Sequence, residues 1–184
     1  MELPDTATMS PRVSSDRDAV DFQRRLAAHA GIVRKVAATY VWNDADRADL
    51  MQDIVAALWQ AWPRYDPRRP FPTWMYRVAL NVAISHVRGE TLRRRHHTAF
   101  DPEVHVVHAP VRDHEAEEQE HLLQRAMAGL ESLDRALLLL HLDEMSHADI
   151  AEVLGTTAGN VATRLGRIRQ RLRRAIHDID QETP

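Results

Sequence analysis

Residues 146–165 read SHADIAEVLGTTAGNVATRL, and their pattern predicts two short helices that cross at a tight turn. Ile150 lies on the apolar face of the first helix, and Ala151 is small where the two helices would cross. Gly155 stands where the chain must reverse direction, and glycine accepts the left-handed backbone angles that such a turn requires. Val161 closes the pair from the second helix. The stretch therefore has the form of a helix-turn-helix.

The second helix of this pair separates its residues into two faces. Its apolar stripe consists of Val161, Leu165, Ile168 and Leu172. Outside that stripe lie the polar and basic residues Thr157, Asn160, Thr163, Arg164, Arg167 and Arg171. A helix that reads duplex DNA needs polar groups near its start and cations further along for phosphates. An ordinary helical hairpin with a solvated arginine face is the alternative, but the glycine turn, the small crossing residue and the single sign of charge favour DNA binding.

The composition excludes several classes of protein. No cysteine occurs among the 184 residues, which rules out disulfide scaffolds, thiol catalysis and cysteine zinc sites. The six glycines form no phosphate-cradling loop. No apolar run reaches the ~20 residues that span a bilayer, and the N-terminus lacks the pattern of a secretory signal. We therefore expect a cytoplasmic protein without membrane insertion, and the abundance of Ala, Leu and Arg favours an all-helical fold.

The apolar periodicity divides the chain into two small helical domains. We expect a disordered tail over residues 1–17, a helical bundle over 18–96, a flexible linker over 97–113 and a second helical domain over 114–180. The helices expected in the first domain run from Asp18 to Tyr40, from Asn43 or Asp44 to Pro63, and from Pro72 to residues 93–96. Those expected in the second domain cover 114–131, 137–142 after a cap at Ser132 or Asp134, 146–154 and 157–178.

Charge is separated along the chain, although the net charge is only −3. One basic cluster consists of Arg64, Arg68, Arg69, Arg77, Arg88, Arg93, Arg94 and Arg95. A second consists of Arg164, Arg167, Arg169, Arg171, Arg173 and Arg174. Two basic surfaces separated by acidic stretches predict that the protein binds a polyanion at two points. Ordinary solvation of helix surfaces is the alternative reading.

An acidic face is expected on the second helix of the first domain. Asp49, Gln52 and Asp53 are spaced i, i+3 and i+4, which places them on one side of a helix. An exposed pair of carboxylates without a second contributing segment would stay ionised and would have no shifted pKa for catalysis. A protein contact or plain solvation is therefore expected in place of acid–base chemistry.

A basic, aromatic segment follows this helix. Three prolines within residues 63–70 require a loop there. The polar and aromatic residues of the loop and of the helix after it are Tyr65, Arg68, Arg69, Phe71, Trp74, Arg77, Asn81 and Arg88. Aromatic rings interleaved with arginines suit single-stranded nucleic acid, because bases stack on the rings while the cations follow the phosphates. Phe71 and Trp74 could instead be core residues, and the apolar stripe of the helix favours this in part for Trp74.

The histidines do not form a convincing metal site. His96, His97, His105, His108 and His114 lie in an aperiodic stretch. They lack the rigid helical spacing that would direct two imidazoles at one ion. We expect neither a metal nor another cofactor. A helical metalloenzyme built from these histidines and the acids is a rival hypothesis, and it requires an activity that chelators remove.

Both halves together resemble a known family. The chain is similar to the extracytoplasmic-function sigma factors, the smallest class of bacterial RNA polymerase sigma subunit. The residues that resemble region 2 of that family are Asp49-x-x-Gln52-Asp53, Trp59, Phe71-x-x-Trp74-x-x-Arg77, Asn81 and Arg88. The residues that resemble region 4 are Leu130-x-x-Leu133, Met145-Ser146, Asp149-Ile150-Ala151, Leu154-Gly155 and Val161-x-x-Arg164-Leu165-x-Arg167. Each half alone is moderately specific, and both in this order are highly specific.

The resemblance implies a subunit without catalytic activity that binds core RNA polymerase and promoter DNA. Asp49, Gln52 and Asp53 would dock on the clamp of the largest catalytic subunit, and the second domain would meet the flap. The loop over residues 63–72 and the helix after it would recognise and open the −10 element. The helix from Thr157 would read the −35 element as duplex. An anti-sigma factor is a further partner that the resemblance implies.

A stand-alone helix-turn-helix regulator is the main alternative. Such a protein binds duplex DNA as a dimer, so it predicts a palindromic site and tight binding without polymerase. This alternative does not explain the acidic face of Asp49 and Asp53 or the arginine–aromatic loop.

Overall fold

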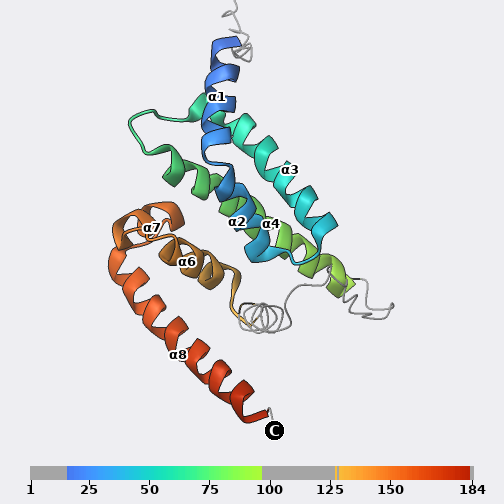
Figure 1. Cartoon of the computed structure of the whole chain (residues 1–184), viewed down its shortest axis with the longest axis vertical. Coiled ribbons are helices and arrows are strands. Elements are labelled where there is room, and N and C mark those ends of the chain that lie inside the picture. Colours follow the sequence, from blue (N-terminus) through green and yellow to red (C-terminus); the bar gives the residue numbers. More distant parts are fainter. Residues whose placement is uncertain (1–15, 97–126, 128, 183–184) are drawn as a thin grey trace, which may run out of the picture.

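A computed structural model describes residues 16–96, 127 and 129–182, and every structural statement below refers to these residues. The all-helical prediction is confirmed over them (Figure 1). The helices of the first half are α1 (Asp16–Ala28), α2 (Ala30–Tyr40), α3 (Asp44–Ala61), the short 3-10 helix η1 (Trp62–Arg64) and α4 (Phe71–His96). Those of the second half are α6 (Ser132–Leu142), α7 (His147–Leu154) and α8 (Ala158–Glu182).

Some expectations fall outside the described residues. These are the tail up to residue 15, the linker over 97–113 with its histidines, and most of the helix expected over 114–131. In the part that is described, no helix is long and apolar enough to cross a membrane.

Local signals determine where α3 begins and ends. The Asn43 side chain accepts hydrogen bonds from the backbone N–H groups of Ala45 (2.8 Å) and Asp46 (3.3 Å), so Asn43 is the N-cap. The carboxylates of Asp44 and Asp46 in the first turn favour the positive end of the helix dipole. Pro63 follows the last turn, in η1, as expected. These boundaries confirm the sequence prediction.

Two helix boundaries differ from the prediction. The segment expected as one helix from Asp18 to Tyr40 breaks at His29, whose backbone leaves helical geometry at φ −120° and ψ 18°. Helix α6 begins at Ser132, five residues before the expected start, and Glu131 occupies the N-cap position without a side-chain bond. Ser132 and Asp134 are therefore inside the helix and do not cap it. The Asp134 side chain makes contacts with another helix instead, as described below.

The first bundle, α1–α4, packs around a core in which α2, α3 and α4 meet (Figure 1). The apolar stripe of α3 points into it, because Leu50, Ile54 and Leu58 are fully buried. Met75 and Ala79 bury the corresponding side of α4. The periodicity of 3.6 residues therefore leaves the opposite faces of α3 and α4 open to solvent.

The second bundle, α6–α8, contains the expected helix-turn-helix. Gly155 ends α7 in the left-handed region at φ 66° and ψ 40°, a conformation that strains any residue with a Cβ. Ser146 caps α7 by accepting a hydrogen bond from the Asp149 backbone N–H at 3.1 Å. Ile150 and Val161 are fully buried where α7 and α8 cross. The two bundles also touch, with α6 and α7 lying against α2 and α4 (Figure 1).

Candidate nucleic-acid and polymerase interfaces

The acidic face of α3 is accessible. Asp49, Gln52 and Asp53 are all exposed, and they lie opposite the buried stripe that begins at Leu50. The helix is therefore held by its apolar side while its carboxylates face solvent. This arrangement suits a contact with a basic surface of another protein.

An aromatic cluster supports the start of α4. Trp62 stacks on Tyr65 with ring centroids 5.3 Å apart and planes 18° apart. Trp74 lies 5.0 Å from Tyr65 and 5.3 Å from Phe71, again between ring centroids. Phe71 is only 5% exposed, whereas Tyr65 and Trp74 are half-buried. The cluster therefore offers Tyr65 and Trp74 at its surface, with Phe71 packed behind them. A DNA contact of Phe71 stays a prediction.

The loop over residues 65–70 is organised by its own hydrogen bonds. The Tyr65 hydroxyl donates to the Arg69 carbonyl at 2.8 Å. Asp66 accepts from Arg68 through both carboxylate oxygens, at 3.0 Å from Nε and 2.8 Å from Nη2. The side-chain hydrogen bond from Arg68 lowers the pKa of the Asp66 carboxyl below its usual range. Sequence reasoning missed Asp66, although an Asp at the start of a proline-rich turn is a local signal that points to such bonds.

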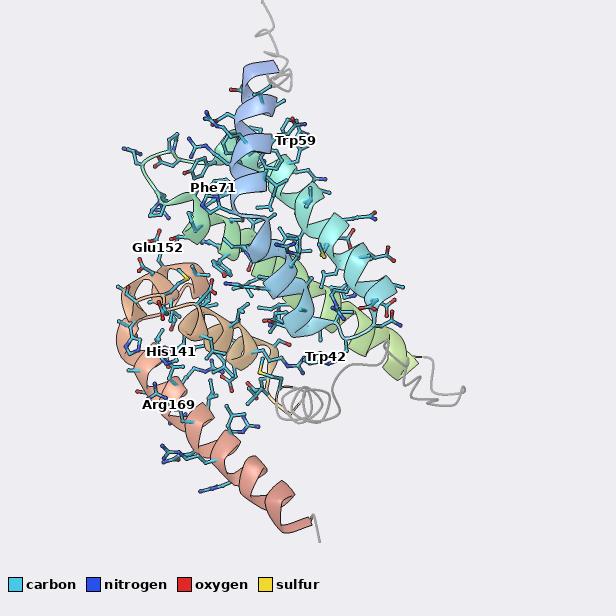
Figure 2. All side chains as sticks on the ribbon, viewed as in Figure 1. Trp42, Trp59, Phe71, His141, Glu152 and Arg169 are labelled. Atoms are coloured by element: carbon cyan, nitrogen blue, oxygen red, sulfur yellow. The ribbon has the colours of Figure 1, made fainter. Side chains whose placement is uncertain are left out.

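The basic face of α4 is exposed. Arg77, Asn81 and Arg88 are spaced i, i+4 and i+11, so they form one row along the helix, and all three are solvent-exposed. Arg69 lies at the start of this row, but its Nη1 donates to Glu152 Oε1 of α7 at 2.9 Å. Figure 2 shows Glu152 on the side of α7 that faces the start of α4. A shallow pocket between the two helices is lined by Arg69, Thr73, Trp74, Arg77, Glu152 and Val153.

The start of α8 presents polar groups to solvent. The Thr157 hydroxyl accepts a hydrogen bond from the Asn160 backbone N–H at 3.3 Å, which confirms Thr157 as the cap. Asn160, Thr163 and Arg167 are exposed. The Thr163 hydroxyl donates to the Gly159 carbonyl at 2.9 Å, which fixes its direction along the helix. The Asn160 side-chain amide donates to the Thr156 hydroxyl at 2.7 Å, which holds it near the start of the helix.

Arg164 and Arg171 are engaged within the protein. Arg164 binds the Asp134 carboxylate of α6 through Nε (3.0 Å) and Nη2 (2.8 Å), and Arg171 lies 3.6 Å from the other carboxylate oxygen. The Arg171 Nη2 also donates to the Gly129 carbonyl at 3.3 Å. The sequence predicted DNA contacts for both arginines, which stay a prediction, and a helix cap at Ser132 or Asp134. The structure instead joins α6 to α8 through this carboxylate, whose side chain is only 10% exposed.

Comparison with known proteins identifies the family. The family model for Sigma-70 region 2 matches residues 26–93, and that for Sigma-70, region 4 matches residues 120–172. The ECF RNA polymerase sigma factor SigC of Mycobacterium tuberculosis is 32% identical over 136 residues, which cover 72% of this chain and 71% of SigC. The chain belongs to the extracytoplasmic-function sigma factors. The region 2 match runs from the end of α1 into α4, and the region 4 match includes α6, α7 and α8 as far as residue 172. We call the bundle α1–α4 region 2 of this sigma factor and the bundle α6–α8 region 4.

Further relatives agree with this assignment. The RNA polymerase sigma factor CnrH of Cupriavidus metallidurans is 29% identical over 170 residues, which cover 88% of each chain. A solved complex of the sigma factor RpoE with the anti-sigma factor NepR from Bartonella quintana has a TM-score of 0.69 at 19% identity, and the match covers 85% of this chain and 97% of that one. The structure of CnrH with the cytosolic domain of CnrY has a TM-score of 0.64 at 24% identity, with coverage of 91% and 92%. At these identities the two structures show the shared fold.

Membership defines the general function. As an extracytoplasmic-function sigma factor, the protein directs transcription initiation and is not itself an enzyme. Membership in the sigma family also implies binding to core RNA polymerase. The rival hypotheses of a helical metalloenzyme and of a stand-alone regulator are therefore wrong.

Proposed function

We propose that region 2 docks on the clamp of the largest polymerase subunit and captures the opened −10 element, while region 4 meets the flap and reads the −35 element. The observation that carries this proposal is the exposed row of Arg77, Asn81 and Arg88 on α4, next to a loop that its own hydrogen bonds hold in shape. A preorganised loop loses less conformational entropy when it binds, so more of its contact energy becomes affinity.

The acidic face of α3 is the surface that contacts polymerase in this proposal. Asp49, Gln52 and Asp53 are exposed on the side away from the core, so they are available to basic groups of the clamp. Charge complementarity of this kind steers association and fixes the orientation of the partners.

The loop over residues 65–70 and the start of α4 bind the opened −10 strand in this proposal. Flipping a base out of a duplex costs a few kcal/mol, which stacking and hydrogen bonds to the base must offset. Tyr65 and Trp74 provide partly exposed rings, with Phe71 packed behind them. Arg77 and Arg88 are exposed cations for the phosphates, and Asn81 provides an amide that can both donate and accept. Arg68 is exposed as well, and it would exchange its bonds with Asp66 for a phosphate.

The exposed face of α8 contacts the −35 duplex in this proposal. Asn160 and Arg167 are the residues we assign to base edges, because their side chains are exposed on the face away from the Val161 stripe. Thr157 and Thr163 lie beside them and provide hydroxyl groups near the start of the helix. Arg164 and Arg171 support this surface through Asp134.

An anti-sigma factor is the further partner that we propose. The relatives RpoE and CnrH are seen in complexes with NepR and with the cytosolic domain of CnrY, respectively. This chain shares their fold over most of its length, which supports a comparable partner in the cytoplasm.

The test is reconstitution with core RNA polymerase. We expect the purified chain to form a holoenzyme that starts transcription at discrete promoters. Reversing Asp49 and Asp53 together to arginine should abolish co-purification with core enzyme while the circular dichroism spectrum stays unchanged, since both side chains are exposed. Glu144→Arg, at an exposed acid outside α3, is the control for altered charge. Unchanged holoenzyme formation by the reversed variant would remove α3 from the docking surface.

A further inference from the structure

Helix α1 contacts the loop over residues 65–70, here called the −10 loop, through one arginine. The Arg25 guanidinium lies over two rings of the aromatic cluster, with its Cζ 5.9 Å from the ring centroid of Tyr65 and 5.9 Å from that of Phe71. Figure 2 shows Phe71 beside α1. A cation within about 6 Å of a ring centroid is attracted by the negative face of the ring. Arg25 therefore makes cation–π contacts with the first residue of the −10 loop and the first residue of α4.

An ion pair on α1 holds this guanidinium in place. Arg25 Nε donates to Asp21 Oδ2 at 2.9 Å, one helical turn earlier, and Arg24 donates to the other carboxylate oxygen. The side-chain hydrogen bond from Arg25, and after it that from Arg24, lowers the pKa of the Asp21 carboxyl below its usual range. The two arginines differ in their surroundings, because the Arg24 side chain is 76% exposed and the Arg25 side chain only 37%.

The break between α1 and α2 adds a second tie to the same place. His29, where the backbone leaves helical geometry, donates from its ring Nδ1 to the Arg25 carbonyl at 3.0 Å. The His29 ring also meets the Phe71 ring edge to face, with centroids 5.3 Å apart. The end of α1 is therefore joined to the start of α4 through both Arg25 and His29.

Tyr65 is the ring of this group that is available to a nucleotide. It is half-buried, whereas Phe71 is buried. Its hydroxyl is fixed to the Arg69 carbonyl and its ring stacks on Trp62, so the contact with Arg25 adds a third restraint. A base that stacks on a ring gains the full stacking energy only if the ring is already in position, because ordering the ring on binding would offset part of that energy.

We infer that Arg25 is a positioning residue of the −10 site, which from α1 holds the Tyr65 ring in the orientation that stacks on an unpaired base. The inference rests on the proposed function, because it concerns the same loop. Arg25 precedes residue 26, where the match to region 2 begins. The attraction requires a cation over the ring, so the charge of residue 25, and not only the length of its side chain, decides how firmly the ring is held.

Three variants of the full chain isolate that charge. Arg25→Met keeps an unbranched apolar side chain and removes the cation, whereas Arg25→Lys keeps both. Arg24→Met is the matched control, because it removes the neighbouring arginine that pairs with the same Asp21 carboxylate. All three should keep the far-ultraviolet circular dichroism of the wild type, since neither arginine is a core residue.

The first measurement is near-ultraviolet circular dichroism of the free chain, which reports aromatic side chains in fixed packing. The signal should weaken in Arg25→Met and stay at the wild-type intensity in Arg25→Lys and Arg24→Met. An unchanged spectrum in Arg25→Met would overturn the positioning of the ring. A loss in Arg25→Lys equal to that in Arg25→Met would contradict the role of the charge.

The second measurement is binding of the reconstituted holoenzyme to a promoter fragment whose non-template −10 strand is unpaired. The apparent dissociation constant should rise about fivefold in Arg25→Met, the factor that corresponds to a cation–π contact of about 1 kcal/mol, and stay near the wild-type value in the other two variants. The slope of log affinity against log salt concentration should not change, because Arg25 acts on a ring. A slope that is shallower by about 0.7 would show a phosphate contact and would overturn the positioning role.

A double-mutant cycle with Tyr65→Leu establishes whether Arg25 acts through that ring. In the Tyr65→Leu background, Arg25→Met should weaken binding by less than about twofold, and a full fivefold loss there would refute the coupling. If the wild type binds the unpaired fragment and Arg25→Met binds it equally well, the inference fails and the proposed function stands. If the wild-type holoenzyme does not prefer the unpaired fragment to the duplex, capture of the −10 strand fails, and the role of Arg25 in it fails as well.

Discussion

The pair formed by Asp134 and Arg164 gives the sharpest test of how region 4 is held together. Asp134 is 10% exposed and Arg164 is 27% exposed in their side chains, and two short contacts join them. Removing one partner of a fully buried ion pair costs about 3–5 kcal/mol, because the other charge is left without compensation. Water reaches Arg164 in part, so we expect Asp134→Ala to lower the free energy of unfolding of region 4 by about 2 kcal/mol.

A double-mutant cycle separates this pair from its surroundings. The cycle compares Asp134→Ala, Arg164→Ala and the double variant, and the expected coupling energy is about 1–3 kcal/mol. Asp134 also lies 3.6 Å from Arg171, and Arg164 lies 3.6 Å from Glu131, so each single variant loses one further contact and only the cycle isolates the pair. Arg167→Ala is the control, because Arg167 is exposed on the same helix and lies outside this pair.

Urea unfolding of the full chain measures these energies. All four tryptophans lie between residues 42 and 74, so their fluorescence reports region 2, whereas far-ultraviolet circular dichroism reports every helix. The variants should shift the dichroism transition and leave most of the fluorescence transition in place. A coupling energy near zero would refute the argument. It would mean that Arg164 is free to read bases, as its position in the motif first indicated.

Three other predictions follow from the same surfaces. Arg167→Ala should cost about 1–3 kcal/mol in −35 binding and relax specificity at one base pair, whereas a uniform loss with a shallower salt dependence would indicate a phosphate contact. Replacing residues 65–70 by a Gly/Ser linker should leave binding to core polymerase and to the −35 element unchanged but should prevent promoter opening. Permanganate reactivity of thymines near the start site measures this opening. Normal reactivity would assign the melting of the duplex to α4. Asp143, which follows the last residue of α6, accepts hydrogen bonds from Lys35 of α2 and Tyr76 of α4. Burial alone would raise the pKa of its carboxyl, but these bonds outweigh it and lower the pKa. Its contribution to the free energy of unfolding is therefore present above the ordinary pKa of 3.8 and is lost as the pH falls below that value. The free energy of unfolding measured in urea should therefore decrease on acidification below about pH 4 in the wild type, and an equal decrease in Asp143→Asn would contradict this assignment.

The sequence by itself determined the elements whose signals are local. Asn43 and Ser146 start helices because their side chains bond backbone groups two or three residues away. Gly155 marks its turn because the left-handed backbone there excludes most other residues. The 3.6-residue period separates buried Leu50 and Val161 from the exposed faces of α3 and α8. The family resemblance draws on these same local patterns, so the fold class and the general function were both predictable.

Only the tertiary structure decided which charged groups are free and which are paired. Asp134 meets Arg164 across 30 residues of chain, and Asp143 meets Tyr76 across 67. No spacing rule connects residues so far apart, because their distance depends on how whole helices pack. For the same reason the sequence predicted two domains but not the closed contact between them. The electrostatic role of each arginine is therefore a property of the packed helices and not of its place in the motif.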